Sequence, residues 1–225
     1  FLQATRIVKR KAIEVSVDFV SEFNEVSKKP GVIVLTNYPE KYIDRGYLEF
    51  LKEYAKSKGV RLIEAYKSKK NIAFFEFYKI ADFALYPTIK EGFGNQLLEA
   101  MYYRILPIVF EYEVFKRDLK KEGYRYISLG QRYRTVDGLV KIPEKRIQRA
   151  VKKALYYLSH PKSYRAAVET NYRIANKYHA PKVLENYYRL LMMSIGVEKT
   201  LLNLKNLIGL PKVQWKKLIT TLTKA

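Results

Sequence analysis

The chain has 225 residues, 48% of them hydrophobic, so it is long enough to bury the core of one large α/β domain. It has no cysteine and only two histidines, His160 and His179, which excludes disulfides and thiolate metal sites and disfavours a histidine-rich metal centre or a Ser-His-Asp triad. The net charge of +21 favours anionic partners such as nucleotides, nucleic acid or anionic lipid surfaces, although many lysines without cysteine are also typical of proteins from hot environments.

The first part of the chain alternates apolar runs with segments of helical spacing. We expect strands at 1–8, 32–35, 60–66, 83–86, 106–110 and 126–129. We expect helices at 12–26, 47–55, 71–80 (buried), from 95 onward and within the charged segment 111–123. This alternation predicts an α/β fold with a Rossmann-like parallel sheet covered by helices on both faces.

The last part of the chain has a different pattern. The polar residues 130–143 predict a connection, and helices are expected at 144–158, 164–178 and from Pro181 to about 195. We therefore predict a domain over 1–195 and an amphipathic, basic helical extension over 196–225, with Trp215 on its apolar face. This extension could lie on an anionic membrane surface or pack against its own domain or a partner lobe.

Residues 82–104 read as strand, loop and helix, and the rest of the chain is organised around them. Gly92 and Gly94 bracket a turn whose backbone can approach a ligand closely, and the helix begins near Asn95. Glu91 opens the turn, and Glu99 lies about one turn into the helix. Because helical side chains lean toward the helix N-terminus, both carboxylates are expected to face the same space.

The first amides of that helix and the positive end of its dipole face this space too. The sequence thus predicts a helix N-terminus that binds an anion between two carboxylates, which suits a ligand with phosphates and hydroxyls, such as a sugar nucleotide. The alternative is that Glu91 caps the helix and Glu99 is a surface residue.

A second cationic element stands at the start of the chain. Arg6 lies near the end of the first strand, and a basic loop runs through Lys11 into the first helix. Ligands bind at the carboxyl edge of a parallel sheet, so both cations are placed to hold phosphate. Ordinary basic surface is the alternative in a chain with 43 basic residues.

The run Glu91-Gly-Phe-Gly-Asn-Gln-Leu-Leu-Glu99-Ala, preceded by Ala-Asp-Phe-Ala-Leu-Tyr-Pro, resembles the signature of family 4 retaining glycosyltransferases of GT-B fold. The resemblance implies that the chain is the C-terminal, donor-binding lobe. It implies that Glu91 contacts the donor sugar, Glu99 the nucleotide ribose, and Arg6 and Lys11 the diphosphate. The remaining donor-binding residues would be Gly92, Phe93, Gly94, Asn95, Gln96 and Leu97.

The resemblance implies sugar transfer from a UDP- or GDP-linked donor to an acceptor hydroxyl, with retention at the anomeric carbon. Arg6, Lys11 and the amides at Gly94 and Asn95 would stabilise the leaving diphosphate, so no metal or other cofactor is required. Such enzymes also need an N-terminal lobe that binds the acceptor. Since the chain starts at Phe1 without an initiator methionine, we expect a fragment whose missing lobe is a partner.

The stretch Pro107–Asp118, with Asn95, is similar to a subset of the family that makes glycerate-linked glucosides, such as mannosylglucosylglycerate synthases. This chain has Phe110-Glu111 where an asparagine-arginine pair often follows the strand in that subset. This departure leaves the transferred sugar open. The acceptors that we expect are a sugar, a glycerate-type compound or a lipid.

Three alternatives remain open. A nucleotide-sugar epimerase can share this fold, a basic chain can bind nucleic acid, and a transferase can act at a membrane surface on a lipid. Basic residues are spread along the chain without a recognised binding motif, so no specific nucleic-acid partner is expected. No signal peptide or membrane-spanning apolar run is visible, and we expect a cytoplasmic protein, with the inner membrane surface as an optional contact.

Overall fold

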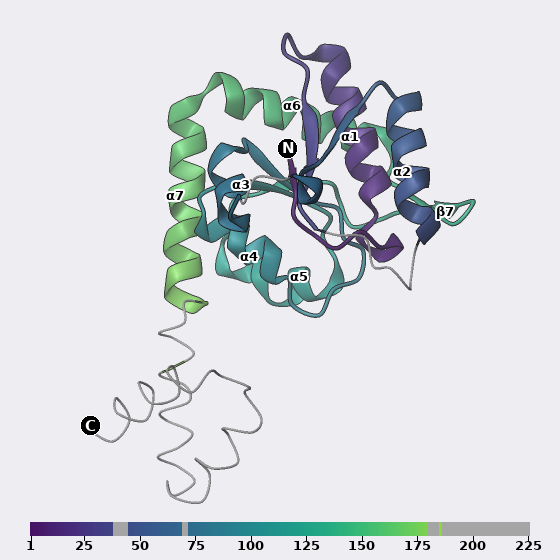
Figure 1. The fold of residues 1–225 in the computed structure, drawn as a ribbon. Coiled ribbons are helices and arrows are strands. Elements are labelled where there is room, and N and C mark those ends of the chain that lie inside the picture. Colours follow the sequence, from purple (N-terminus) through teal and green to yellow (C-terminus); the bar gives the residue numbers. More distant parts are fainter. Residues whose placement is uncertain (38–44, 69–71, 180–184, 186–225) are drawn as a thin grey trace, which may run out of the picture. The chain divides into compact units, whose positions relative to one another are not determined.

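In the computed structural model, the described residues are 1–37, 45–68, 72–179 and 185 (Figure 1). The predicted helix from Pro181 and the predicted extension over 196–225 therefore lie almost entirely outside the described part. Within it, residues 1–176 form one compact unit.

Six strands form one parallel sheet in the order β3-β2-β1-β4-β5-β6. Their bounds are β1 (Leu2–Gln3), β2 (Val32–Leu35), β3 (Arg61–Glu64), β4 (Phe83–Tyr86), β5 (Leu106–Val109) and β6 (Ile127–Ser128). Leu2 pairs with Val34 of β2 on one side and with Ala84 of β4 on the other. The chain builds outward from β1 in one direction and then restarts beside it at β4, so a topological switch point lies between these two strands.

Helices cover the sheet (Figure 1). Their bounds are α1 (Ile13–Val26), α2 (Arg45–Ser57), α3 (Phe74–Ile80), α4 (Asn95–Tyr102), α5 (Glu113–Arg117), α6 (Glu144–Ser159) and α7 (Pro161–Tyr178), with short 3-10 turns η1 (Lys9–Lys11), η2 (Ala65–Lys67) and η3 (Leu119–Glu122). Helix α1 packs against both α2 and α6. These elements confirm the predicted Rossmann-like fold.

The core has two parts because side chains alternate across the strands. Along β4, Phe83 and Leu85 join the main core, whereas Ala84 joins a smaller cluster that contains Leu2 and Tyr78 of α3. All four residues of β4 and of β5 are buried, as expected for central strands of a parallel sheet.

Residues 130–143 hold more structure than a connection. They form an antiparallel hairpin of β7 (Arg134–Val136) and β8 (Leu139–Lys141). Asp137 and Gly138 form its turn, with φ of 51° and 76°, which is the pattern of a two-residue hairpin turn. The signal was present as Asp-Gly between short alternating runs, but the many polar residues hid it.

Two helices also differ from the expectation. Helix α3 is less buried than predicted: Phe75 is 43% and Ile80 77% exposed, because this seven-residue helix turns mainly Tyr78 into the core. Helix α7 begins at Pro161 rather than at residue 164, since proline fits the first position of a helix. No helix in the described part of the chain is both long and apolar enough to cross a bilayer.

Candidate functional site

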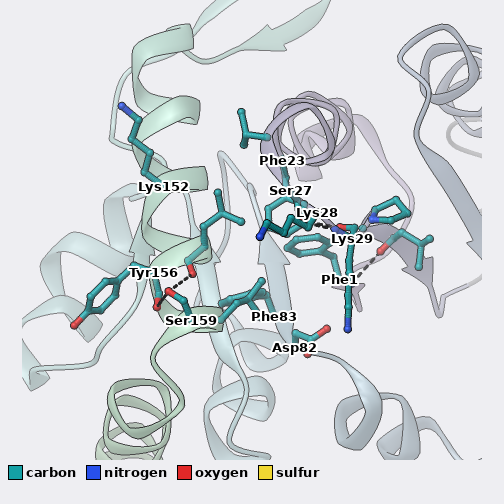
Figure 2. A pocket seen from close by; sticks show the side chains of 16 residues that line it. Phe1, Phe23, Ser27, Lys28, Lys29, Asp82, Phe83, Lys152, Tyr156 and Ser159 are labelled. Atoms are coloured by element: carbon teal, nitrogen blue, oxygen red, sulfur yellow. Dashed lines mark hydrogen bonds between the residues drawn. The ribbon is translucent and has the colours of Figure 1, made fainter.

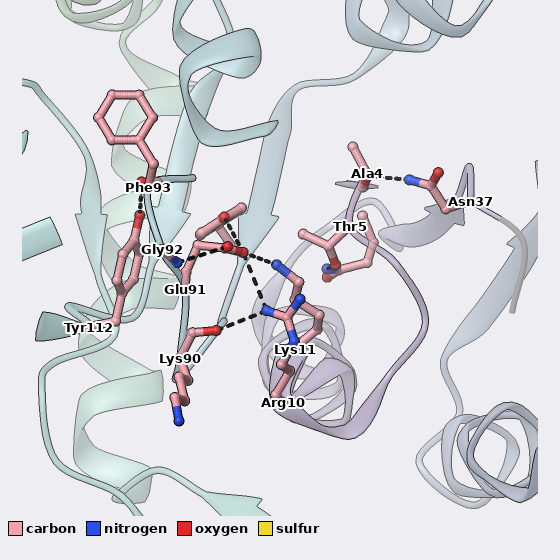
Figure 3. A network of polar contacts seen from close by, with 12 residues as sticks. Ala4, Thr5, Arg10, Lys11, Asn37, Lys90, Glu91, Gly92, Phe93 and Tyr112 are labelled. Atoms are coloured by element: carbon pink, nitrogen blue, oxygen red, sulfur yellow. Dashed lines mark hydrogen bonds and ion pairs between the residues drawn. The ribbon is translucent and has the colours of Figure 1, made fainter. Parts of the chain in front are cut away.

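Two loops meet at the carboxyl edge of the sheet, one after β1 and one after β4 (Figure 3). The backbone N–H of Ile89 donates to the carbonyl of Arg10 at 3.2 Å. The Arg10 guanidinium donates to the carbonyl of Lys90 at 3.0 Å. The structure therefore brings the predicted basic loop against the predicted glycine turn, although 80 residues separate them.

Lys11 and Glu91 form a direct ion pair in this contact (Figure 3). Lys11 is only 2% exposed, and Arg10 Nη1 lies 3.6 Å from the same Glu91 oxygen. Glu91 also accepts hydrogen bonds from the Tyr86 hydroxyl at 3.3 Å and from the Gly92 amide at 3.0 Å. The structure couples Lys11 to Glu91, and the contacts expected of Lys11 with a diphosphate and of Glu91 with a sugar stay predictions.

The environment of this ion pair changes the pKa of both Lys11 and Glu91. Burial lowers the pKa of Lys11, the charges of Arg10 and Arg6 act in the same direction, and the hydrogen bond and charge of Glu91 oppose them. Burial alone would raise the pKa of Glu91, but the hydrogen bonds from Lys11 and Gly92 and the charges of Lys11 and Arg10 bring it below its ordinary value. Glu91 is therefore a carboxylate at neutral pH.

Arg6 differs from Lys11 in its exposure. It follows β1 and has an exposed side chain, and its carbonyl accepts a hydrogen bond from the Val8 amide at 3.1 Å. Its positive charge is close enough to affect Lys11. Arg6, the exposed Lys9 and the 37% exposed Arg10 are thus more accessible than Lys11.

The glycine turn has one strict requirement, at Gly94. Its φ is 108°, and a Cβ there would lie 2.4 Å from the Tyr112 hydroxyl and 3.3 Å from the Tyr86 hydroxyl. The Tyr112 hydroxyl donates to the carbonyl of Phe93 at 2.8 Å and so fixes the turn (Figure 3). A Cβ at Gly92 would meet nothing within 4 Å.

Helix α4 starts directly after this turn. Asn95 and Phe93 are exposed, Gln96 is half-buried, and Leu97 is fully buried in the core. The Leu97 and Leu98 amides donate to the Gly94 carbonyl. Leu97 therefore anchors the start of α4 in the core. The backbone amides that precede Leu97 are the ones that a helix N-terminus presents to an anion.

Glu99 lies on α4 and is half-buried. It accepts a hydrogen bond from the Tyr78 hydroxyl of α3 at 2.9 Å. Sequence reasoning missed both Tyr78 and Arg10, because one stood in an apolar run and the other among many basic residues. It also missed Tyr86 and Tyr112, whose hydroxyls only fold geometry brings to the turn.

A cavity of about 900 Å³ lies elsewhere, at the amino ends of the strands (Figure 2). Phe1, Phe23 and Phe83 line it, with Lys28 and Lys152 among its polar residues. None of the predicted site residues reaches this cavity, so it is separate from the site described above. Among the described residues, no group of three or more His, Asp or Glu side chains is arranged to hold a metal ion.

Comparison with known proteins identifies the family to which this chain belongs. The profile of the family "Glycosyl transferases group 1" matches residues 1–173, and the chain belongs to this family. A mannosylglucosylglycerate synthase of Thermotoga maritima is 41% identical over 198 residues, which cover 82% of this chain and 46% of the relative. The chain thus spans about half the length of that curated relative.

Solved structures agree on the fold. The C-terminal domain of a glycosyl transferase group 1 family protein from Francisella tularensis has a TM-score of 0.58 at 17% identity, over 80% of this chain and 86% of that one. The pneumococcal O-GlcNAc transferase, solved with UDP and GlcNAc, also has a TM-score of 0.58, at 18% identity over 87% of this chain and 35% of that one. The predicted GT-B fold is confirmed, and the epimerase and nucleic-acid-binding alternatives gain no support.

Proposed function

We propose that this chain is the donor-binding lobe of a retaining hexosyltransferase that moves a sugar from a UDP- or GDP-linked donor to an acceptor hydroxyl. One observation carries the proposal: the cationic loop after β1 lies against the glycine turn after β4, with Lys11 paired to Glu91. The groups proposed to bind phosphate and those proposed to bind sugar hydroxyls thus lie at one edge of the sheet.

In this proposal, the diphosphate lies between Arg6, Arg10 and the N-terminus of α4. Its negative charge grows as the bond to the sugar breaks, and fixed cations, amides and the helix dipole stabilise that charge without reorganising. These groups would stabilise the charge of the diphosphate in place of a divalent metal, so the proposed reaction requires no metal.

Glu91 would bind the donor sugar. A carboxylate has about four acceptor positions, and donors from Lys11, Tyr86 and Gly92 occupy three of them. The remaining position accepts a sugar hydroxyl, and Lys11 keeps the carboxylate charged while it does so. Lys11 therefore acts mainly through Glu91, and the exposed arginines contact the phosphates.

The acceptor is proposed to bind on a separate N-terminal lobe. The name of the Thermotoga relative favours a glycerate-type acceptor. The UDP in the pneumococcal structure favours a uridine or similar nucleotide.

The first test is ligand-induced stabilisation of this chain. UDP or GDP at about a hundred times its Kd should stabilise the fold by about 2.7 kcal/mol, seen as a rise in melting temperature. Glu99→Ala should abolish the rise, because it removes the proposed ribose contact. Glu53→Ala, which removes an exposed carboxylate on α2, is the matched control and should keep it. No rise with either nucleotide would refute the proposed function.

A further inference from the structure

Tyr78 of α3 is a buried polar side chain beside Glu99. Its side chain is 1% exposed and lies in a cluster with Leu2, Ala84 and Ala100. Its ring stacks on that of Tyr103 with centroids 5.1 Å apart and an interplanar angle of 27°. The sheet, α4 and a neighbouring ring therefore fix the position of the Tyr78 hydroxyl.

That hydroxyl donates to Glu99 Oε2 at 2.9 Å. Glu99 is half-buried on α4, and an unrestrained glutamate side chain loses considerable rotamer freedom when it binds a ligand. A hydrogen bond from a fixed donor removes much of that freedom before the ligand arrives. Preorganisation of this kind raises affinity by reducing the cost of ordering.

We propose that Tyr78 is a positioning residue that holds the Glu99 carboxylate for the ribose diol of the donor nucleotide, and so favours ribonucleotides over 2′-deoxyribonucleotides. This inference rests on the proposed function, in which Glu99 contacts the ribose. The two residues act together: Glu99 accepts hydrogen bonds from the ribose hydroxyls, and Tyr78 holds the Glu99 carboxylate in the orientation that this requires.

The acceptor capacity of Glu99 fits this role. Tyr78 occupies one of about four positions on the carboxylate, which leaves both oxygens able to accept from ribose hydroxyls. Burial and the Glu99 charge raise the pKa of Tyr78. The phenol is therefore protonated, and able to donate, at neutral pH.

The test measures binding of UDP, GDP and their 2′-deoxy forms to the full chain by calorimetry. Wild type should bind the ribo form roughly tenfold more tightly, since a hydrogen bond to a charged group is lost in the deoxy form. Tyr78→Phe keeps the ring and removes the hydroxyl. It should reduce that preference at least about threefold, while the affinity for the deoxy form changes less than about twofold.

Two controls separate positioning from folding. Tyr103→Phe removes a hydroxyl from the ring stacked on Tyr78 and should leave the preference unchanged. Glu99→Gln should lower the preference by itself, and adding Tyr78→Phe to it should have little further effect, because the two residues act as one unit.

The results distinguish a failure of the proposed function from a failure of the positioning role of Tyr78. If wild type binds no nucleotide, the proposed function fails and this inference fails with it. If wild type binds ribo and deoxy forms equally, or if Tyr78→Phe keeps the wild-type preference or weakens both ligands equally, the proposed function stands and the positioning role of Tyr78 is refuted.

Discussion

At the residue scale, Gly94 shows how the site limits its own sequence. The position has a φ of 108°, and two tyrosine hydroxyls, from Tyr86 and Tyr112, crowd the place where a Cβ would be. Gly92, two residues earlier, has open space around it. The two glycines of the motif therefore have different reasons to be glycine, and only Gly94 is fixed by the packing of its own fold.

This difference has a measurable effect on stability. Gly94→Ala should destabilise the fold by at least about 2 kcal/mol, because it combines an unfavourable backbone conformation with a clash against Tyr112. Gly92→Ala should change stability by less than about 0.5 kcal/mol and is the matched control. Urea denaturation of the two variants measures both values, and equal losses would show that packing around Gly94 does not restrict the turn.

The chemistry at this scale was only partly predictable. Glu91 and Gly94 could be found because carboxylates and glycines at fixed spacing before a helix are a local signal. The partnership of Lys11 with Glu91 could not, since it joins positions 80 residues apart and depends on which strands are neighbours. Tyr78 gave no signal, because a buried tyrosine looks like any other core aromatic.

At the scale of elements, the hairpin of β7 and β8 is attached to α1 through buried polar groups. The Val140 amide donates to Glu14 Oε1 at 2.8 Å, and the Tyr47 hydroxyl of α2 donates to the other Glu14 oxygen. The same hydroxyl accepts from the Ile13 amide at 2.8 Å. A single buried carboxylate thus joins α1, α2 and the hairpin.

Removing one member of this network should be costly. Tyr47→Phe deprives both the buried Ile13 amide and Glu14 of a partner, and we expect a loss of about 3 kcal/mol in the free energy of unfolding. Tyr102→Phe, at a 43% exposed position, should cost less than about 0.5 kcal/mol. Chemical denaturation compares them, and similar values for both would show that the network contributes little.

Elements were the most predictable level. Buried parallel strands and amphipathic helices have strong periodic signals, so their locations agreed with the expectation to within a few residues. The exceptions were short or unusual pieces. The first strand was expected over 1–8, but β1 covers only Leu2–Gln3, and Arg6 lies in the loop that follows it. The hairpin at 134–141 has strands of three residues each, and the seven residues of α3 look more buried than they are. Short elements owe their structure to neighbours rather than to their own pattern.

At the scale of the whole molecule, charge dominates. The chain carries +21 at neutral pH, so every carboxylate that becomes protonated adds to the repulsion within the fold. In the described part of the chain, three glutamates, Glu64, Glu91 and Glu111, have a pKa below the ordinary 4.5. Burial alone would raise it, but lysine partners and hydrogen bonds outweigh burial. Glu14, whose pKa burial raises, acts in the opposite direction.

These shifts predict acid sensitivity. A carboxylate with a lowered folded pKa contributes stability that is complete above the unfolded value of 4.5 and is lost as the pH falls through the folded value. The free energy of unfolding should therefore fall below about pH 4.5. Urea denaturation across pH 3 to 7 measures the slope. Glu91→Gln should show a shallower slope than wild type, and a steeper or equal slope would mean that the pKa of Glu91 is not lowered by folding.

The sheet order was predictable only as a class. Alternating strands and helices require parallel pairing and right-handed crossovers. The periodic pattern does not say that β1 becomes a central strand with β2 and β4 as neighbours. The family resemblance implied a GT-B lobe, and the structure provides the strand order itself.

Because β1 and β4 are neighbours in the sheet, the proposed nucleotide site can form only once β4 has been synthesised. The residues around β1 leave the ribosome before those around β4, and Lys11 can pair with Glu91 only after Glu91 has emerged, 80 residues later. Nucleotide binding would therefore show that β1 and β4 have come together in the sheet. A nascent chain that ends before β4 could form its earlier helices and strands but would not bind nucleotide.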